Sequence, residues 1–470
     1  MSLPRLLEYE SNYPLYGIAF SHSPNHPFRI ALTTLLTGPT NKLFLVDAVQ
    51  PDALQNPLHH SHHHHHHHHQ HHQTQNSYYP QNGAAAAGPS SGPDFHQIAS
   101  INMNFPATKV GWEPRESLAM ASAYDDGGRG ELIATSGDAL RIYEVTKEWG
   151  TGHDSTGSGG YVGGGGGGAG GKNGWSNAPN GNDGGGGGYS YSLKSRSMLS
   201  NSKTPHTSLP PVTSFSWNPK SPNSIVTCSI DTTATLWDIN TSQALTQLIA
   251  HDRAVYDLSW LPDSSDIFVS VGADGSLRAF DLRQLEHSTI LYESSKDTPL
   301  ARIAFSNKEQ HMMACFGLDD SKIMILDMRS PGQPVAELVG HQAPLGGIAW
   351  GSPGTSSRNE VTGGGWLASC GDDSQVLLYD LTSPLPETRP PSTQPPTSKS
   401  PNTVLSPPMT PGSQGGGGGG GGRTPSPSQA VEVLPVSGWT AHAEVNNLAF
   451  SEQGDWLGCV SGAKLNVLRV

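Results

Sequence analysis

Residues 248–283 read LIAHDRAVYDLSWLPDSSDIFVSVGADGSLRAFDLR, and this stretch decides the fold class. Apolar and polar residues alternate in it over short runs, and turn-forming residues separate the runs every eight to twelve positions. A period of two, with β-branched and aromatic residues enriched, predicts β-strands and not helices. The stretch therefore predicts one unit built from several short strands.

Fixed spacings recur along the chain. In three places an Asp stands six residues before an aromatic residue, and a further Asp follows that aromatic. These pairs are Asp231 with Trp237, Asp274 with Phe280, and Asp373 with Tyr379. In two places a His stands nine residues before a Trp: His251 before Trp260 and His341 before Trp350. Recurrence at constant offsets indicates internal repeats.

Seven copies of the repeat can be aligned on their first strands. The predicted starts lie near Leu15, Thr108, Val212, Ala254, Leu300, Pro344 and Val445. The uninterrupted copies are 42, 46 and 44 residues apart, and four-stranded propeller blades run about 40–45 residues. Six blades would leave one start unexplained, and eight would need a copy hidden in poly-Gly. The sequence therefore predicts an all-β fold, a seven-bladed β-propeller that spans residues 1–470 as a single domain.

Three low-complexity segments interrupt the repeats: a His/Gln-rich one at 49–97, a Gly-rich one at 147–204 and a Pro/Ser/Gly-rich one at 382–430. Together they hold 32 of the 56 Gly residues. Such composition cannot bury enough apolar surface to fold, so we expect disordered insertions. Each follows a predicted third strand and precedes a fourth, which predicts that all three emerge from the same face of the propeller.

The last copy supplies three strands and lacks a fourth. It ends at residues 464–470, KLNVLRV, whereas residues 5–10, RLLEYE, precede the first blade. An unclosed sheet would expose its edges. We therefore expect residues 5–10 to pair with the C-terminal blade and to close the ring.

The repeated Asp, His and aromatic residues are expected to hold each blade together. An Asp in the turn between the second and third strands can accept backbone N–H groups and reach a His ahead of the first strand, because buried polar groups need partners. The residues assigned to this structural role are Asp231, Trp237, His251, Asp274, His341 and Asp373, with His442 as a third blade histidine. Blade three lacks a His at the expected offset.

The charge balance argues against direct binding of nucleic acid. The chain has a net charge of −13, and the residues outside the three insertions carry all of the acidic excess. An acidic surface repels phosphate backbones, and the chain has no run of Lys and Arg. No apolar run approaches the ~20 residues of a membrane span, and the N-terminus shows no signal peptide.

Some motifs suggest a metal or cofactor site, but the sequence around each of them lacks the structure that such a site needs. The run of twelve His within residues 59–72 has nothing to fix ligand geometry, so we interpret it as a repeat expansion. Chance GxGxxG matches between Gly163 and Gly188 lack the strand and helix that a dinucleotide site requires. The four Cys are far apart, which is typical of reduced thiols in a cytosolic or nuclear protein. We expect no cofactor, no metal and no catalytic residue set.

The repeats resemble WD-repeat propellers, on the Trp237–Asp238 pair, the Ala250–His251 pair and the period. Within that class they are similar to the plant regulators of anthocyanin and trichome formation, of the transparent testa glabra type, and their animal relative. The similar segments are residues 26–35, 132–145, 229–239, 245–260 and 270–293. The animal relative binds dual-specificity tyrosine-regulated kinases and associates with cullin-type ubiquitin ligases.

This resemblance implies a non-catalytic scaffold of the cytoplasm and nucleus. It implies protein kinases and transcription factors as partners, gathered by a monomeric propeller within larger complexes. The alternative is a substrate receptor of a cullin-type ubiquitin ligase. An enzyme with a site in the channel is a third reading, and it has no residue set in its favour.

Four residues are candidates for partner binding, and they fall in two pairs. Arg253 and Tyr256 flank the start of the first strand of blade four, where a guanidinium and an aromatic ring could anchor a partner; the alternative is a solvated Arg and a core Tyr. Arg283 and Arg329 each end an Asp-x-Arg motif, which resembles the adaptor contact of WD-repeat ligase receptors; the alternative is a turn Asp with a solvated Arg. Five Ser or Thr residues precede Pro in the third insertion and are candidate phosphosites: Ser400, Ser406, Thr410, Thr424 and Ser426.

Overall fold

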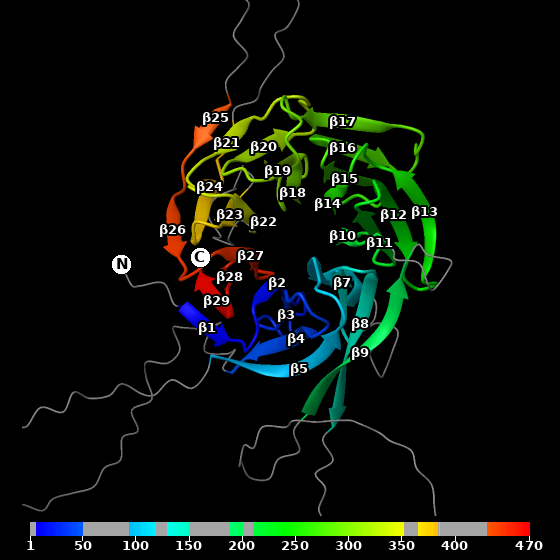
Figure 1. Cartoon of the computed structure of the whole chain (residues 1–470), viewed down its shortest axis with the longest axis vertical. Helices are drawn as coiled ribbons and strands as arrows, with labels where there is room; N and C mark the ends of the chain where they lie inside the picture. Colours follow the sequence, from blue (N-terminus) through cyan, green and yellow to red (C-terminus); the bar gives the residue numbers. More distant parts are fainter. Residues whose placement is uncertain are drawn as a thin grey trace, which may run out of the picture.

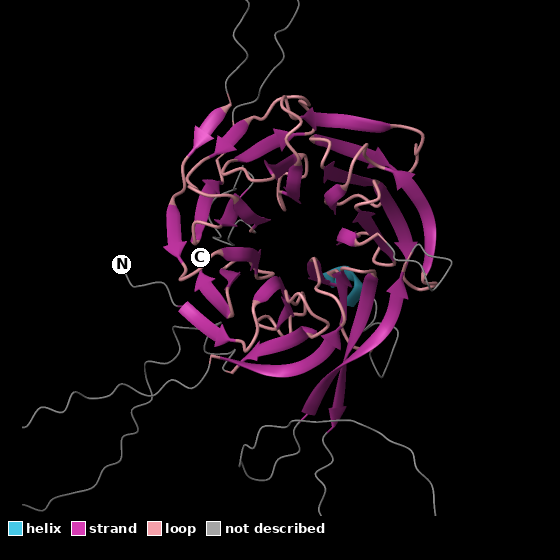
Figure 2. Cartoon of the chain, in the orientation of Figure 1, coloured by secondary structure: helices cyan, strands magenta, loops and turns pink. Residues whose placement is uncertain are grey.

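The structure is a computed structural model that describes residues 6–49, 94–118, 129–149, 189–200, 210–351, 365–383, 385 and 430–470 of the chain. Strands dominate these ranges, and residues 115–118 form a helical turn (Figure 2). The His run and the five Ser/Thr-Pro sites lie outside the described residues.

Seven sheets surround a central opening (Figure 1), and each has a meander of at least three strands. Blade 1 has β2 (Leu15–Phe20), β3 (Ile30–Thr34), β4 (Asn41–Ala48) and β5 (Phe95–Met103). Blade 2 has β6 (Lys109–Trp112), β7 (Leu132–Ser136), β8 (Leu140–Trp149) and β9 (Tyr189–Leu199). Blade 3 has β10 (Val212–Trp217), β11 (Ser224–Ser229), β12 (Thr233–Asp238) and β13 (Gln243–Ile249). Blade 4 has β14 (Val255–Trp260), β15 (Ile267–Gly272), β16 (Ser276–Asp281) and β17 (Ser288–Glu293).

The remaining blades contain strands that are not consecutive in the chain. Blade 5 has β18 (Leu300–Phe305), β19 (Met312–Gly317), β20 (Ile323–Asp327), β21 (Ala336–Leu338) and β25 (Val431–Val433). Blade 6 has β22 (Leu345–Trp350), β23 (Gly365–Gly371), β24 (Gln375–Leu381) and β26 (Ser437–Thr440). Blade 7 has β27 (Val445–Phe450), β28 (Trp456–Ser461), β29 (Lys464–Arg469) and β1 (Leu6–Glu10). The prediction of a seven-bladed propeller is confirmed, and each first strand begins within one residue of its predicted start.

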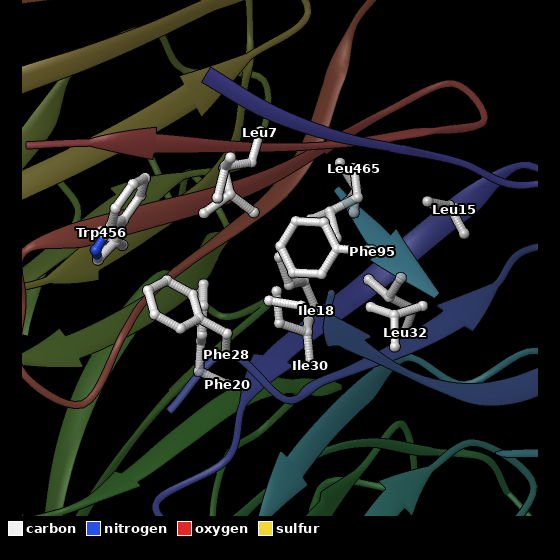
Figure 3. Packing of buried hydrophobic residues seen from close by; sticks show 14 of the residues in the cluster. Leu7, Leu15, Ile18, Phe20, Phe28, Ile30, Leu32, Phe95, Trp456 and Leu465 are labelled. Carbon is white, nitrogen blue, oxygen red and sulfur yellow. The ribbon is translucent and has the colours of Figure 1, made fainter. Parts of the chain in front are cut away.

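The hydrophobic core lies between the blades. Among the described residues, seven clusters of buried side chains occur, and each draws its members from two neighbouring blades. Figure 3 shows the cluster between blades 7 and 1, where Leu7 and Trp456 of blade 7 pack near Phe28 and Phe95 of blade 1. Both faces of every sheet are therefore covered by an adjacent sheet, and alternating apolar residues face one neighbour or the other.

Tryptophans of three first strands tie neighbouring blades together. The indole N–H of Trp112 donates to the Ala19 carbonyl of blade 1 at 3.0 Å. Trp260 donates in the same way to Ser216 of blade 3, and Trp350 donates to Ala304 of blade 5, both at 3.0 Å. Each bond gives the indole N–H of a buried Trp an acceptor, which is a backbone carbonyl of the preceding blade.

The N-terminal strand completes the last blade. Strand β1 pairs antiparallel with β29, with Leu6 opposite Leu468 and Glu10 opposite Lys464. Figure 1 shows the two strands side by side at the rim. Leu7 is buried in the cluster between blades 7 and 1, so this strand contributes to the core as well as to the sheet.

The low-complexity segments join third to fourth strands in blades 1, 2 and 6, but their predicted boundaries are wrong. Residues 95–97 belong to β5, residues 147–149 to β8, and residues 189–199 form β9. Strand β9 is an outer strand with an exposed, Ser-rich side. Its polar composition resembles that of the low-complexity segment before it, which is why the sequence assigns it to the insertion. The long hairpin of β8 and β9 reaches beyond the ring (Figure 1).

The connections alternate between two faces of the ring, since an antiparallel meander turns at opposite ends. We call the anchor face the side with the loops that lead into first strands, such as 250–254, and the turns between second and third strands, such as 273–275. The insertion face is the opposite side, where third strands connect to fourth strands. All three low-complexity segments leave from the insertion face.

Removal of the low-complexity segments should barely change stability. Trp149 pairs with Tyr189, so a tight turn of about four residues can replace residues 150–188. Residues 386–429 can be shortened to a link of about ten residues, because loop-closure entropy depends only weakly on length. We expect the melting temperature to fall by a few degrees at most, measured by calorimetry. Loss of a cooperative transition would show that these segments belong to the folded core.

Candidate protein-binding surfaces

Blade 4 carries an Asp–His pair on the anchor face. His251, ahead of β14, lies with Nδ1 2.9 Å from Oδ1 of Asp274 in the turn between β15 and β16. The His251 Nε2 lies 2.8 Å from the Ser270 hydroxyl of β15. Asp274 also accepts the Ser276 backbone N–H at 3.1 Å. These bonds fix the loop, the turn and the second strand to one another, which is a structural role.

The electrostatics of this pair favour a neutral imidazole beside a carboxylate. Burial of the ring lowers the pKa of His251, and the Asp274 charge only partly offsets this. Burial also opposes ionisation of Asp274, but bonds from Ser276 and His251 outweigh it and lower the pKa of Asp274 to about 2. A satisfied and buried pair of this kind is poorly suited to proton transfer with a substrate.

Blade 6 repeats the arrangement. The Nδ1 of His341 lies 3.0 Å from Asp373, and its Nε2 lies 2.8 Å from the Ser369 hydroxyl. The Tyr379 hydroxyl donates to the Val339 carbonyl at 3.3 Å, and burial raises the pKa of Tyr379 to about 12. The third-strand aromatic residue of blade 6 is thus hydrogen-bonded to the segment that leads into the first strand of the same blade.

Blade 3 keeps the Asp without a His. Asp231 accepts the backbone N–H of Thr233 at 3.1 Å and its hydroxyl at 2.7 Å. Between them Thr232 adopts a φ of 74°, which is unfavourable for a β-branched residue and needs such support. The Trp237 indole donates to the Thr227 hydroxyl at 2.9 Å. The turn is therefore held locally.

The assignment of His442 as a blade histidine is wrong. His442 is exposed, and the buried residue at the corresponding place before the first strand is Ala441. Val445 pairs at the start of β27 as Val255 does at the start of β14, and this alignment sets Ala441 against His251. Blade 7 has only Gly462 and Ala463 in its turn and no Asp there, so a His would have no partner.

Hydroxyl residues of the second strands complete these assemblies, and the sequence reasoning missed them. They are Thr227, Ser270 and Ser369. Each stands four residues before the Asp of its turn, at Asp231, Asp274 and Asp373. This constant offset is a signal in the sequence that could have identified them.

Asp257 of β14 links four blades near the channel wall and was also missed. This residue is 3% exposed, and its Oδ1 accepts the Ser214 hydroxyl of blade 3 at 2.5 Å and lies 3.3 Å from the Lys109 Nζ of blade 2. Its Oδ2 accepts the Ile303 N–H of blade 5 at 3.1 Å. Burial opposes the charge, but Lys109 and Arg302 outweigh this and lower the pKa of Asp257. The carboxylate is a structural link and not an available base.

The four Cys are buried on second strands of separate blades: Cys228 on β11, Cys315 on β19, Cys370 on β23 and Cys459 on β28. Burial raises the pKa of each thiol, to about 12 for Cys228, Cys315 and Cys459. These thiols are protonated packing residues and not nucleophiles.

Arg253 and Tyr256 flank the start of β14, at the anchor face of blade 4. Arg253 is exposed in the loop that leads into β14, and Tyr256 is half-buried as the second residue of that strand. The guanidinium group of Arg253 is therefore accessible to a partner, and the Tyr256 side chain is partly packed in the blade and partly exposed.

Arg283 and Arg329 lie on the insertion face, opposite Arg253. In blades 3 to 6 the Asp that follows the third-strand aromatic position accepts the backbone N–H two residues later. These bonds join Asp238 to Asn240, Asp281 to Arg283, Asp327 to Arg329 and Asp380 to Thr382, at 2.8–3.0 Å. The Asp therefore belongs to the turn in all four blades. In blades 4 and 5 the Arg side chain also pairs with this Asp, yet it stays 65% and 58% exposed.

The described part of the chain shows no group of three or more His, Cys, Asp or Glu side chains placed to hold a metal ion. A pocket on the insertion face lies where blades 7, 1 and 2 meet and is lined by Pro24, Phe28, Arg115 and Trp456, among others. None of the candidate residues lines it. Within the described ranges, no helix is long and apolar enough to cross a membrane.

Comparison with known proteins gives the following relationships. Residues 199–238, 242–281 and 332–380 match the family described as WD domain, G-beta repeat. The chain is 29% identical over its whole length to the full-length DDB1- and CUL4-associated factor 7 homolog of Dictyostelium discoideum. It is 32% identical over 390 residues to an uncharacterized WD repeat-containing protein of Schizosaccharomyces pombe, covering 79% of this chain and 76% of that one. A WD repeat-containing protein of Saccharomyces cerevisiae is 38% identical over 290 residues, covering 56% and 53%.

Asp257 and Asp231 should differ in their contribution to stability. Asp257→Ala leaves the buried Ile303 N–H and Ser214 hydroxyl without their acceptor, and we expect it to lower the free energy of unfolding by about 3–5 kcal/mol. Asp231→Ala removes a bond network within one half-buried turn and should cost about 1–3 kcal/mol. Urea denaturation of both variants measures the difference. If the two variants lost the same free energy of unfolding, the link that Asp257 makes between blades would stabilise the protein no more than the bonds within one turn do.

Proposed function

Since this chain belongs to the WD-repeat family of β-propellers, we propose that it is a non-catalytic scaffold that holds partner proteins together. Propellers of this family generally act as interaction platforms. The observation that carries the proposal is that the buried polar side chains of the ring serve structure, whereas the candidate binding residues are exposed. The His–Asp pairs and Asp257 are consumed by structural bonds, whereas Arg253, Arg283 and Arg329 are exposed on two opposite faces. Binding on two faces raises the effective concentration of one partner near another.

We propose protein kinases and transcription factors as the partners, in the cytoplasm and the nucleus. The resemblance to the plant pigment regulators and their animal relative supports this choice. The net charge of −13 supports an indirect action on genes, because an acidic propeller would reach DNA through a bound factor.

The anchor-face contact is tested with Arg253→Glu combined with Tyr256→Ala. We expect this variant to lose at least about tenfold in recovery of a dual-specificity tyrosine-regulated kinase by co-precipitation, because Arg and Tyr are the side chains that most often dominate an interface. Arg283→Glu, on the opposite face, is the matched control and should retain the kinase. A normal melting curve with unchanged recovery would exclude Arg253 and Tyr256 as the contact.

A second function is favoured by the exposed Asp-x-Arg motifs: recruitment to a cullin-type ubiquitin ligase as a substrate receptor. Arg283 and Arg329 project from adjacent blades in a sector where the turns between third and fourth strands are short. The name of the Dictyostelium relative, a DDB1- and CUL4-associated factor, supports DDB1 as the adaptor.

Adaptor binding should depend on the two arginines and not on the turns beneath them. We expect Arg283→Glu with Arg329→Glu to abolish binding of purified DDB1, because the guanidinium groups are exposed while the Asp backbone bonds persist. Thr382→Glu changes the equivalent position of blade 6 and serves as the control. Isothermal titration calorimetry gives the affinity. Retention of binding by the double variant, or no binding by the wild type, would reject the receptor function.

A further inference from the structure

Blade 5 has a fifth strand, and this strand comes from a distant part of the chain. Strand β25 pairs in parallel with β21, with Val431 beside Ala336 and Val433 beside Leu338. Figure 1 shows β25 outside β21, at the rim of the ring. In the other six sheets the described residues form four strands. The outer edge of β21 therefore accepts a parallel strand.

The pairing of β25 is short. The Val431 N–H donates to the Val335 carbonyl at 3.3 Å, and the Val339 N–H donates to the Val433 carbonyl at 3.1 Å. Val433 is half-buried and packs on the cluster between blades 5 and 6. Val431 is 41% exposed, and Glu432 is exposed. A three-residue strand held in this way is easily exchanged.

The middle residue of β25 is a poor electrostatic match for its neighbour. Glu432 lies beside Glu337 of β21, and like charges in adjacent positions of a sheet are destabilising. The Lys322 Nζ lies 3.1 Å from the Glu337 carboxylate, and Glu432 adds to the effect of Glu337 in raising the pKa of Lys322. One ammonium group therefore serves two carboxylates, and the edge keeps an excess of negative charge.

We propose that the outer edge of blade 5 is a strand-binding site, which β25 fills in cis and a partner protein fills in trans with an extended segment. The segment has β-branched residues at the positions of Val431 and Val433, and Lys or Arg at the position of Glu432. The β-branched residues reproduce the contact of Val433 with the core, and the cation pairs with Glu337. This inference rests on the proposed scaffold function. It names one class of partner for the scaffold, an extended peptide segment with Lys or Arg at its central position.

The test uses the full chain and two labelled peptides. One has the sequence of residues 430–435, AVEVLP, and the other is AVKVLP, with Lys at the central position. Val431→Pro with Val433→Asp vacates the edge, since it removes the donor to Val335 and charges the packed position. Glu432→Pro with Leu434→Asp is the matched control. It makes the same two changes one residue later, where the Glu432 backbone points away from β21 and Leu434 is 70% exposed.

Fluorescence anisotropy should show the Lys peptide binding the vacated variant about tenfold more tightly than the wild type or the control, because an occupied site lowers apparent affinity by its free fraction. The Glu peptide should bind the vacated variant several-fold more weakly than the Lys peptide. Equal binding of the Lys peptide to vacated and wild-type chains, or equal affinity of the two peptides, would overturn the proposal.

A single substitution keeps the proposal testable if the vacated variant fails to fold. Glu432→Lys should strengthen β25, slow amide exchange at Val339 and reduce binding of the Lys peptide below the wild-type level. Unchanged exchange and unchanged binding would also overturn the proposal. Co-precipitation of the kinase by the wild type reports on the scaffold function separately, so a chain that recovers its partner but fails the peptide test leaves that function in place.

Discussion

Within the described residues, no blade of this propeller has a hydrophobic core of its own. Each of the seven buried clusters in the described residues is shared by two neighbouring sheets, so each blade needs both neighbours to cover its two faces. This constraint explains why single blades can lose local anchors. Blade 3 has no His ahead of its first strand, and blade 7 has neither a His at that position nor an Asp in the turn between its second and third strands, yet both are held by packing from either side.

The same constraint assigns most polar side chains to structure. Polar side chains hold the loops and turns between the packed sheets: Asp274 and Asp373 are bonded to buried histidines, and Asp257 links blades 2 to 5. What remains for function is the surface of a stiff ring. Chemistry at an internal site would compete with these bonds, whereas binding at a face or an edge leaves them intact.

Features with local causes could be predicted from the sequence. Alternation and repeat length located the seven first strands, and the offsets between His251, Asp274 and their counterparts in blade 6 identified a bonded pair. The missing features depend on distant neighbours. Asp257 is recognisable only when blades 2, 3 and 5 surround it, and β25 pairs with a strand nearly a hundred residues away. Strand β9 is polar because it is an outer strand, and His442 was misaligned by one position.

The pairing of β1 with β29 has a consequence for the order of events during synthesis. Residues 6–10 emerge from the ribosome before their partner residues 464–469, which follow more than 450 residues later. At the usual rates of translation the N-terminal strand waits roughly half a minute or longer with an unpaired edge. The earlier blades can assemble meanwhile as an open arc. The ring then closes in a single late step, which makes the unclosed arc the form that chaperones would need to shield.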